Sequence, residues 1–331
     1  MPSRLPRRRA AILALALAVG LSLVCGIVPG ALAQSNPVKV ITGFAPGGSV
    51  DALARMAADA VAAATGRTAI VENKTGAAGR LAVDLVKSAP PDGDTLLVAP
   101  QGPMTLFEHV FKDKLKYDPA KDFSPITRLA TADFALTIGP MVPAKDLAGF
   151  RTWLKTAGDK ASFGSPGAGT LPHFVGISVG EKLGVPMTHV PYQGSAKTMI
   201  DLAGGQIAAA VSPVTEALEL HKAGKVHIIA TTGAKRSPFV PDVPTFKEAG
   251  VDVEVPLWFA VYGPAGIPAA TVEMLRKAID AGFATPDATQ RLAKLGLVAA
   301  PMTPAELEAL RQRETAMWAP VVKASGFTPS N

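Results

Sequence analysis

A glycine-rich segment near the start of the chain has residue types that suit the binding of an anion. It reads Gly43-Phe-Ala-Pro-Gly-Gly-Ser-Val-Asp51 and lies between an apolar strand pattern at 38–41 and a helical pattern at 50–64. A glycine-rich loop before a helix leaves backbone N–H groups free, and the helix dipole adds partial positive charge there. We therefore expect an anion at this loop, with Ser49 as the N-cap of the helix.

Three further segments repeat this strand–loop–helix design. They are Asn73–Gly79, Gly164–Thr170 and Pro191–Ser195, each rich in Gly, Ser, Thr or Pro. Each of them, taken alone, is also consistent with an ordinary turn that connects a strand to a helix. Together they favour one shared cleft, because loops at the carboxyl ends of strands gather at one edge of an open α/β sheet. Neutral donors in such loops would hold a carboxylate without a buried cation.

Most sequence patterns of enzymes are missing from this chain. It contains no Walker A sequence, no G-x-G-x-x-G after a strand and no G-x-S-x-G nucleophile elbow, and its histidines form no zinc-binding pattern. His173 follows the third loop by one helical turn and is either a ligand contact or a donor that steadies the loop. We expect no catalytic residue, no metal and no cofactor.

Two aromatic residues have positions that bear on a cleft. Tyr192 lies in the fourth loop, where it would either form a wall of the cleft or donate its hydroxyl to the ligand. Trp258 lies in a Pro-marked segment, and we interpret it as core or hinge packing.

Strand and helix patterns alternate along the chain and would position these loops. The predicted strands after the first are 68–72, 95–99, 134–139, 161–165, 189–192, 207–212, 226–231 and 257–263. The predicted helices are 51–64, 77–88, 146–157, 172–183, 196–203, 214–223, 268–284, 287–295 and 304–323, the last opened by the capping box Thr303-Pro-Ala-Glu306. Such alternation predicts an α/β architecture with mainly parallel sheets.

Two Pro-marked segments, 139–143 and 255–259, are candidate crossings between two lobes. A lobe inserted between them would make the other lobe discontinuous in sequence. We therefore predict lobe 1 at 34–138 plus 257–331 and lobe 2 at 139–256.

The first 33 residues have the pattern of an export signal. Arg4, Arg7, Arg8 and Arg9 precede an apolar run at 10–28, and Ala31-Leu32-Ala33 is a small-x-small cleavage site. We predict a signal peptide cleaved after Ala33, by either the general secretory or the twin-arginine route. A retained membrane anchor and a lipoprotein attached at Cys25 are the alternatives.

Charge and cysteine content limit the function classes further. Cys25 is the only cysteine of the chain, so the mature protein would contain neither a disulfide nor a cysteine metal site. Four of the 33 basic residues fall in the predicted signal, and the rest nearly balance the 27 acidic residues. The charge balance therefore gives no support for a nucleic-acid partner.

Motifs in chain order resemble those of one known family along nearly the whole mature chain. They are Phe44–Asp51, Val71–Gly79, Pro90–Leu97, Tyr117–Pro125, Phe163–Thr170, His189–Gly194, Asp201–Gln206, Ala234–Pro238 and Pro241–Thr245. Their sequences resemble the Bug-type receptors, the extracytoplasmic solute receptors of tripartite tricarboxylate transporters.

This resemblance implies a type II periplasmic-binding-protein fold, with two α/β lobes joined by two crossing strands and a ligand cleft between them. It implies a periplasmic, non-enzymatic receptor that captures a small organic carboxylate and delivers it to the membrane subunits of a tripartite transporter. We expect the receptor to be a monomer. The ligand-binding residues carried over are Phe44, Ala45, Pro46, Gly47, Gly48, Ser49 and Asp51 in lobe 1, with Ser165, Gly167, Gly169, Thr170, His173 and Tyr192 in lobe 2.

The chain departs from the family pattern at three places. Ser212 stands where the family commonly has an aspartate, which removes an acceptor for a ligand ammonium and makes an amino-acid ligand less expected. Ser212 is kept among the predicted ligand-binding residues. Residues 99–102 replace the Gly-Thr that the family usually has there, so the resemblance does not specify that wall of the pocket. In the second loop, Lys74-Thr75-Gly76 replaces the usual Arg-Pro-Gly.

Two other functions remain as alternatives. One is a secreted hydrolase on a similar two-lobed fold, which would lose turnover on mutation of Ser165 or His173. The other is a ligand-sensing module that passes its ligand state to a signalling partner. The sequence does not identify the ligand, which can belong to the aliphatic di- and tricarboxylates, the nicotinate-like acids or the aromatic dicarboxylates. Nor does it show whether a cognate transporter exists.

Overall fold

The structure, a computed structural model, describes residues 36–192 and 194–329. The predicted signal peptide, its cleavage site after Ala33 and Cys25 lie outside the described residues. Within those two described ranges, no helix combines the length and the apolar character that crossing a membrane would need.

The strands join in a ten-stranded arrangement whose main path runs β2-β1-β3-β9-β4-β7-β5-β6, with β8 and β10 also paired to β4. Their bounds are β1 Val38–Thr42, β2 Ala69–Asn73, β3 Thr95–Pro100, β4 Phe123–Ile138, β5 Ser162–Ser165, β6 Thr188–Pro191, β7 Ala209–Pro213, β8 His227–Thr231, β9 Pro256–Pro264 and β10 Val298–Ala299. The predicted strands are all present within one or two residues of these bounds, except that β4 begins well before its predicted start.

The sheet is mixed rather than mainly parallel. β1 is parallel to β2 and β3, and β5 is parallel to β6 and β7. In contrast, β9 runs antiparallel to β3 and β4, and β4 runs antiparallel to β7, β8 and β10. The prediction of mainly parallel sheets is therefore wrong for the two longest strands, which run back through the middle of the sheet.

Strand β4 connects two groups of strands along its 16 residues. Its residues from Phe123 to Asp133 pair with β9, and those from Phe134 to Ile138 pair with β7 and β8. The change of partner thus falls between Asp133 and Phe134, ahead of the Pro-marked segment at 139–143 that the sequence indicated. The register of β4 against β9 shifts twice, between Pro125 and Thr127 and between Arg128 and Ala130, which marks bulges.

The helices between the strands follow the predicted pattern. They are α2 Ser49–Thr65, α3 Arg80–Lys87, α4 Gly102–Thr105, α5 Phe107–Phe111, α6 Leu147–Ala157, α7 Leu171–Leu183, α8 Ser195–Ala203, α9 Val214–Lys222, α10 Ala269–Phe283, α11 Pro286–Lys294 and α12 Pro304–Ser325, with the short 3₁₀ turns η1 Ala77–Gly79, η2 Lys112–Lys114 and η3 Gly158–Lys160. Among the described residues, α4, α5, η2 and η3 have no counterpart among the sequence predictions, and the helix predicted at 77–88 is divided into η1 and α3.

Helices cover both faces of the first strands, because consecutive side chains of a strand point to opposite faces. Val40 and Leu96 belong to the same buried cluster as residues of α2 and α10. Their neighbours Ile41 and Leu97 belong to a second cluster with residues of α3 and α12. Strands buried on both faces read as continuous apolar runs, which explains why these segments were recognised from sequence.

The strands around β5 and β7 are covered in the same way. Phe163 of β5 packs in one buried cluster with Phe150 of α6 and Phe174 of α7. Leu202 of α8 and Ala217 of α9 pack in another cluster, which includes Ala210 of β7. Both groups of strands therefore have helices on two faces, as the α/β prediction requires.

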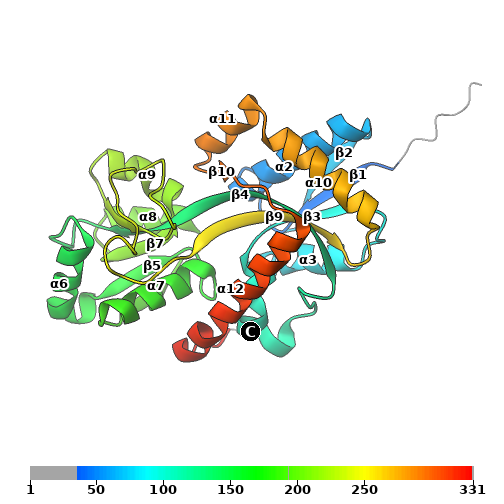
Figure 1. Cartoon of the computed structure of the whole chain (residues 1–331). Coiled ribbons are helices and arrows are strands. Elements are labelled where there is room, and N and C mark those ends of the chain that lie inside the picture. Colours follow the sequence, from blue (N-terminus) through cyan, green and yellow to red (C-terminus); the bar gives the residue numbers. More distant parts are fainter. Residues whose placement is uncertain (1–35, 193, 330–331) are drawn as a thin grey trace, which may run out of the picture. The chain divides into compact units, whose positions relative to one another are not determined.

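The long helix α12 links regions that are far apart in sequence. It begins at the predicted capping box, in which Thr303 accepts from the N–H of Glu306 and the Glu306 side chain accepts from the N–H of Thr303. It contacts α4, α5, β4 and α7, and Figure 1 shows it running from the region of β3 toward α7. The end of α12 therefore reaches the helix that follows the third glycine-rich loop.

Candidate functional site

A cavity of about 310 Å³ opens where the loops after the strands meet the starts of helices. Its size is at the lower end of the range of small-molecule sites. The described residues that line it are Phe44, Ser49, Val50, Ala78, Pro100, Gly102, Pro103, Phe107, Phe134, Pro166, Thr170, Leu171, Pro172, Ser195, Pro213, Leu257 and Phe259.

Helix starts surround this cavity. Ser49 is the first residue of α2, Leu171 of α7 and Ser195 of α8, while Pro213 directly precedes α9. The N–H groups in the first turn of a helix have no partner within the helix, and they carry the positive end of the helix dipole. The cavity can therefore receive an anionic group through backbone and hydroxyl donors.

The structure brings some of the predicted site residues to the cavity wall and leaves the others outside its described lining. Phe44, Ser49 and Thr170 line the cavity. The predicted residues that are not among the described lining are Ala45, Pro46, Gly47, Gly48, Asp51, Ser165, Gly167, Gly169, His173, Tyr192 and Ser212. Contact between these residues and a ligand stays a prediction.

Asp51 holds the first glycine-rich loop in place. Its carboxylate accepts from Gly47 N at 3.0 Å, from Asn73 Nδ2 at 2.9 Å and from Arg55 Nε at 3.0 Å. Burial by itself would raise the pKa of Asp51, but the hydrogen bonds from Arg55, Gly47 and Asn73 outweigh burial and leave that pKa below its ordinary value. Asn73 also donates to Phe44 O at 2.9 Å, so the side chain at the end of β2 fixes the loop at both ends.

The N-cap of α2 differs from the prediction by one residue. The cap is Gly48, with extended φ and ψ of −84° and 172°, and Ser49 is already the first helical residue. No described side chain caps this helix start; the carboxylate of Asp51, in the first turn, instead accepts from Gly47 N and so ties the loop to the helix. The Ser49 side chain is thereby left at the cavity wall.

The second glycine-rich loop packs directly against the first. A Cβ at Gly43 would lie 2.4 Å from the Cα of Gly79, and a Cβ at Gly79 would lie 3.2 Å from the Phe44 ring. Two residues before Gly79, Ala77 and Ala78, have φ of 48° and 57°. Such left-handed backbone is uncommon for residues other than glycine, and here it brings Ala78 to the cavity wall.

The third loop is held by its own side chains. Thr170 Oγ1 donates to Gly167 O at 2.7 Å, and Ser165 Oγ donates to the same carbonyl at 3.2 Å. Ser165 Oγ also lies 2.8 Å from His189 Nε2. These bonds fix the turn that presents Thr170, Leu171 and the start of α7 to the cavity.

His173 and His189 support this loop from behind as a stacked pair, with ring centroids 3.8 Å apart. His173 Nδ1 accepts from Gly169 N at 3.2 Å, so its role toward the loop is that of an acceptor rather than a donor. Burial lowers the pKa of each ring to about 4, and the neighbouring His173 adds to the effect at His189. Both rings are therefore neutral near pH 7.

The contact between Ser165 and His189 does not have the geometry of a hydrolase nucleophile. Ser165 is fully buried and stands behind the cavity wall rather than in it. Its Oγ lies 3.2 Å from Gly167 O and 2.8 Å from His189 Nε2, and both contacts hold the third loop. A nucleophile would need its hydroxyl exposed to the cavity, where a substrate could reach it.

Tyr192 is half-buried against a hydrophobic cluster, and Ser212 lies in the interior. Burial and a hydrogen bond to the Asp201 carboxylate raise the pKa of Tyr192 to about 12. Ser212 is fully buried, and its hydroxyl points toward Pro213 O at 3.4 Å. Trp258 is buried within the core beside β3 and α12, as the interpretation of core or hinge packing requires.

The sequence reasoning missed most of the apolar wall. Phe134 comes from β4, Leu257 and Phe259 come from β9, and Phe107 comes from the short helix α5. A proline or glycine next to a strand end was the one signal that could have pointed to Pro100, Pro166 and Pro213. Nothing in the sequence indicates that Phe107, Phe134, Leu257 and Phe259 join the glycine-rich loops at one cavity.

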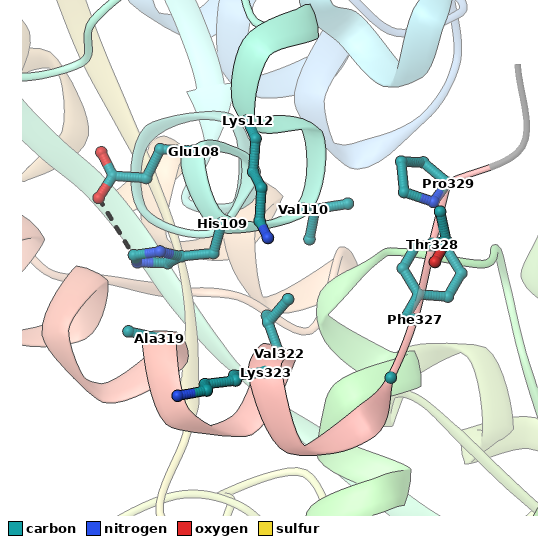
Figure 2. A pocket seen from close by; sticks show the side chains of 11 residues that line it. Glu108, His109, Val110, Lys112, Ala319, Val322, Lys323, Phe327, Thr328 and Pro329 are labelled. Atoms are coloured by element: carbon teal, nitrogen blue, oxygen red, sulfur yellow. Dashed lines mark ion pairs between the residues drawn. The ribbon is translucent and has the colours of Figure 1, made fainter.

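A second cavity, of about 660 Å³, lies between α5 and the end of α12 (Figure 2). Its walls include Lys112, Lys323 and the pair of Glu108 and His109, whose Oε1 and Nε2 atoms are 3.4 Å apart. It lies at the carboxyl ends of α5 and α12, where helix carbonyls carry partial negative charge. The two lysine ammonium groups suit an anion, but the glycine-rich loops and the starts of α2, α7 and α8 lie at the smaller cavity, which is therefore the candidate site.

Phe327, which follows α12 and lies on the wall of the second cavity (Figure 2), connects the C-terminal segment to the third loop. Its ring meets His173 edge-on at a centroid distance of 5.2 Å and Phe174 at 5.8 Å. A Cβ at Gly169 would lie 3.0 Å from this ring. The ring therefore packs against the loop that presents Thr170 to the cavity.

Replacing Phe327 by alanine should lower the free energy of unfolding by about 2 kcal/mol, because a half-buried ring and two aromatic contacts are lost. The Gly169 amide, which donates to His173, should exchange its hydrogen faster. Urea unfolding and amide hydrogen exchange measure the two effects. Met317→Ala, which removes an exposed apolar side chain from α12, is the control. Unchanged exchange at Gly169 would contradict the supporting role of Phe327.

Comparison with known proteins gives a consistent set of similarities. The family described as tripartite tricarboxylate transporter family receptor matches residues 53–327. A UPF0065 protein in the tcbD-tcbE intergenic region of Pseudomonas sp. strain P51 is 32% identical over 286 residues, covering 86% of this chain and 84% of its own.

Solved structures show the same similarity in three dimensions. MatC from Rhodopseudomonas palustris with bound malate is 31% identical with a TM-score of 0.74, covering 86% of this chain and 98% of its own. The periplasmic binding protein BugD is 31% identical with a TM-score of 0.75, covering 89% of this chain and 99% of its own. The prediction of a periplasmic-binding-protein fold is confirmed by this likeness.

Proposed function

Because the chain belongs to the tripartite tricarboxylate transporter receptor family, we propose that it captures a small organic carboxylate and delivers it to the membrane subunits of such a transporter. The observation that carries this proposal is the cavity at which the starts of α2, α7 and α8 meet. Helix starts are anion sites, since their N–H groups have no partner within the helix and the dipole favours negative charge. The malate found in the MatC structure supports a carboxylate as the ligand class.

The strength of such a site is sufficient for a receptor. A hydrogen bond to a charged group contributes about 1.5–3 kcal/mol, and a helix dipole about 0.3–2 kcal/mol. Three or four such bonds would cover the roughly 8 kcal/mol of micromolar binding, less the cost of ordering the ligand. The site needs no cationic side chain to reach a useful affinity.

We also propose two lobes, 34–138 plus 257–331 and 139–256, that close on the ligand. The proposal is supported by β4, whose partners change from β9 to β7 and β8 between Asp133 and Phe134. A ligand that contacts both groups of strands would favour the closed arrangement by its added contacts. The receptor would act in the periplasm as a monomer without catalytic activity, after cleavage of its signal peptide behind Ala33.

Binding is tested on residues 34–331, stripped of any bound ligand by unfolding and refolding. Thermal unfolding is recorded against a panel of mono-, di- and tricarboxylates. A ligand at 100 times its Kd adds about 2.7 kcal/mol of stability, which is a readable shift of Tm. A panel in which no organic acid raises the Tm would contradict the proposed function.

Changing Ser49 to aspartate should lower the affinity for a carboxylate ligand at least tenfold. The new carboxylate would stand at the cavity wall and repel the ligand, yet an acid in the first turn of α2 favours the helix. Titration calorimetry with the acid that gives the largest Tm shift measures the loss. Thr75→Asp adds the same charge to an exposed residue of the neighbouring second loop, outside the described lining and outside the predicted ligand-binding residues, and is the matched control. Equal affinities of the two variants would place the ligand elsewhere.

A further inference from the structure

We propose that the ligand is an organic acid with one carboxylate and an apolar, ring-sized body, and that the cavity discriminates against a second charged group. This inference rests on the proposed function, which makes the 310 Å³ cavity the solute site. It narrows the ligand from carboxylates in general to acids whose charge lies at one end.

The chemistry of the wall carries the inference. Taking the described residues alone, the lining contains no Asp, Glu, Lys, Arg or His, and its polar side chains are the hydroxyls of Ser49, Thr170 and Ser195. The remaining wall is apolar and rich in aromatic rings and prolines: Phe44, Phe107, Phe134, Phe259, Pro100, Pro103, Pro166, Pro172 and Pro213. Such a surface is suited to an apolar body rather than to a compact polar acid.

The donors are concentrated at two of the helix starts. Helices α2 and α8 begin alike, with Gly48-Ser49 and Gly194-Ser195 as cap and first helical residue. The starts of α4 and α7 carry a proline within their first two residues, and α9 contributes to the described lining only through its cap, Pro213. Proline has no N–H to donate. The backbone donors for a carboxylate are therefore those at Ser49 and Ser195, and the proline-bearing starts are poorer in donors.

A second ionised group would meet this apolar wall. Moving an unpaired charge from water to an apolar environment is strongly unfavourable, and an unpaired polar group costs about 1–3 kcal/mol by mutational measures. The first carboxylate uses the N–H and hydroxyl donors at the starts of α2 and α8. The rest of the cavity wall is rich in rings and prolines, which have no hydrogen to donate to a second carboxylate. Compact dicarboxylates and ring dicarboxylates should therefore bind less tightly than ring monoacids.

An ammonium group on the ligand would likewise find little to accept its hydrogens. The carboxylate of Asp51 is already engaged with Gly47, Arg55 and Asn73, and it stands behind the wall. Ser212 occupies the position where an acid was expected, and its hydroxyl points to Pro213 O. An aromatic amino acid should therefore bind less tightly than the matching acid without the amino group.

The experiment is a matched ligand series measured by titration calorimetry on stripped residues 34–331. The series consists of benzoate, cyclohexanecarboxylate, terephthalate, malate, and the pair of 3-phenylpropanoate and L-phenylalanine, which differ only in the amino group. Either of the first two acids should bind at least tenfold more tightly than terephthalate and malate, and 3-phenylpropanoate should bind at least tenfold more tightly than L-phenylalanine. Tighter or equal binding of malate or terephthalate would overturn this inference and leave the proposed function standing. Absence of binding by every acid, here and in the wider panel, would overturn the proposed function and this inference with it.

A cation placed at the wall supplies a second readout. Ala78 lines the cavity, is exposed and already has a left-handed backbone, so Ala78→Arg adds a charge without burying it. The ratio of terephthalate to benzoate affinity should rise at least tenfold in this variant. Ala77→Arg is the control, because Ala77 is also exposed and left-handed but is outside the described lining. An unchanged ratio in Ala78→Arg would count against an apolar wall that excludes the second charge.

Discussion

Replacing Gly43 by alanine is expected to lower the free energy of unfolding by about 3 kcal/mol or more and to weaken ligand binding at least tenfold. The added Cβ would lie 2.4 Å from Cα, 2.7 Å from O and 2.9 Å from C of Gly79. All three are backbone atoms, so no side chain can rotate away to relieve the overlap. The first two glycine-rich loops would have to separate, and both contribute residues to the cavity wall.

Gly48→Ala is the matched control for this prediction. A Cβ at Gly48 would have Ala45 O at 3.9 Å as its nearest neighbour, and the φ of −84° is accessible to alanine. We expect this change to cost about 1 kcal/mol at most, through the weaker capping preference of alanine. Urea unfolding compares the two variants, and a Gly43→Ala protein as stable as Gly48→Ala would show that the backbone contact yields easily.

Most elements could be predicted because their residues carry local signals. Val40, Ile41, Leu96 and Leu97 form apolar runs that only a strand covered on both faces can bury. The amino-terminal half of β4 lacked such a run, since Pro125 and Arg128 interrupt it. That half is a strand because β9 pairs with it across two bulges, and this pairing depends on residues more than a hundred positions away.

The glycine-rich loops that the sequence singles out lie at one cavity, but the chemistry of the cavity wall was only partly predictable. The loops at 44–51, 165–170 and 191–195 do meet at one cavity, since helix starts gather at the ends of strands. Asp51 was interpreted as a ligand contact, yet its partner Asn73 lies 22 positions along the chain and takes one of its oxygens. The apolar wall depends on β4 and β9, whose crossing only the three-dimensional pairing reveals.

The buried network around Glu314 carries the second large prediction. Glu314 accepts from Trp258 Nε1 at 2.9 Å and from Gln101 Nε2 at 3.3 Å. Gln101 in turn accepts from Trp258 N at 2.6 Å and donates to Pro256 O at 3.0 Å. The network therefore joins α12 to the crossing strand β9 and to the residue that precedes α4 at the cavity.

Glu314→Ala should lower the free energy of unfolding by about 3 kcal/mol. The change leaves the Trp258 indole N–H and one amide hydrogen of Gln101 without their acceptor in a buried place, at about 1–3 kcal/mol for each unsatisfied group. Urea unfolding measures the loss. A loss below about 1 kcal/mol would mean that water or a shifted side chain replaces the carboxylate.

The conservative variant Glu314→Gln separates charge from packing through its pH dependence. Burial raises the pKa of Glu314 to about 7 from an ordinary 4.5, although Trp258 and the more distant Arg313 and Arg128 favour the charged form. Because the folded protein binds this proton more tightly than the unfolded chain, protonation of Glu314 stabilises the fold. This contribution is complete below pH 4.5 and is lost as the pH rises through 7. It amounts to about 3 kcal/mol, from 1.36 kcal/mol for each pKa unit.

The difference in stability between the native protein and Glu314→Gln should therefore favour the native protein near pH 4.5 and shift toward the variant by pH 8. The native protein alone would not reveal this, because His173 and His189, whose lowered pKa values lie at about 4, lose their stabilising contribution as the pH falls from 6.5. Subtracting the variant's stability curve removes the contribution of these histidines, which both proteins share.

Glu219→Gln, at an exposed residue of α9, controls for the loss of one negative charge. A difference that stays flat from pH 4.5 to 8 would show that Glu314 keeps one protonation state throughout, and that its carboxylate is accommodated by the network at no cost to the fold.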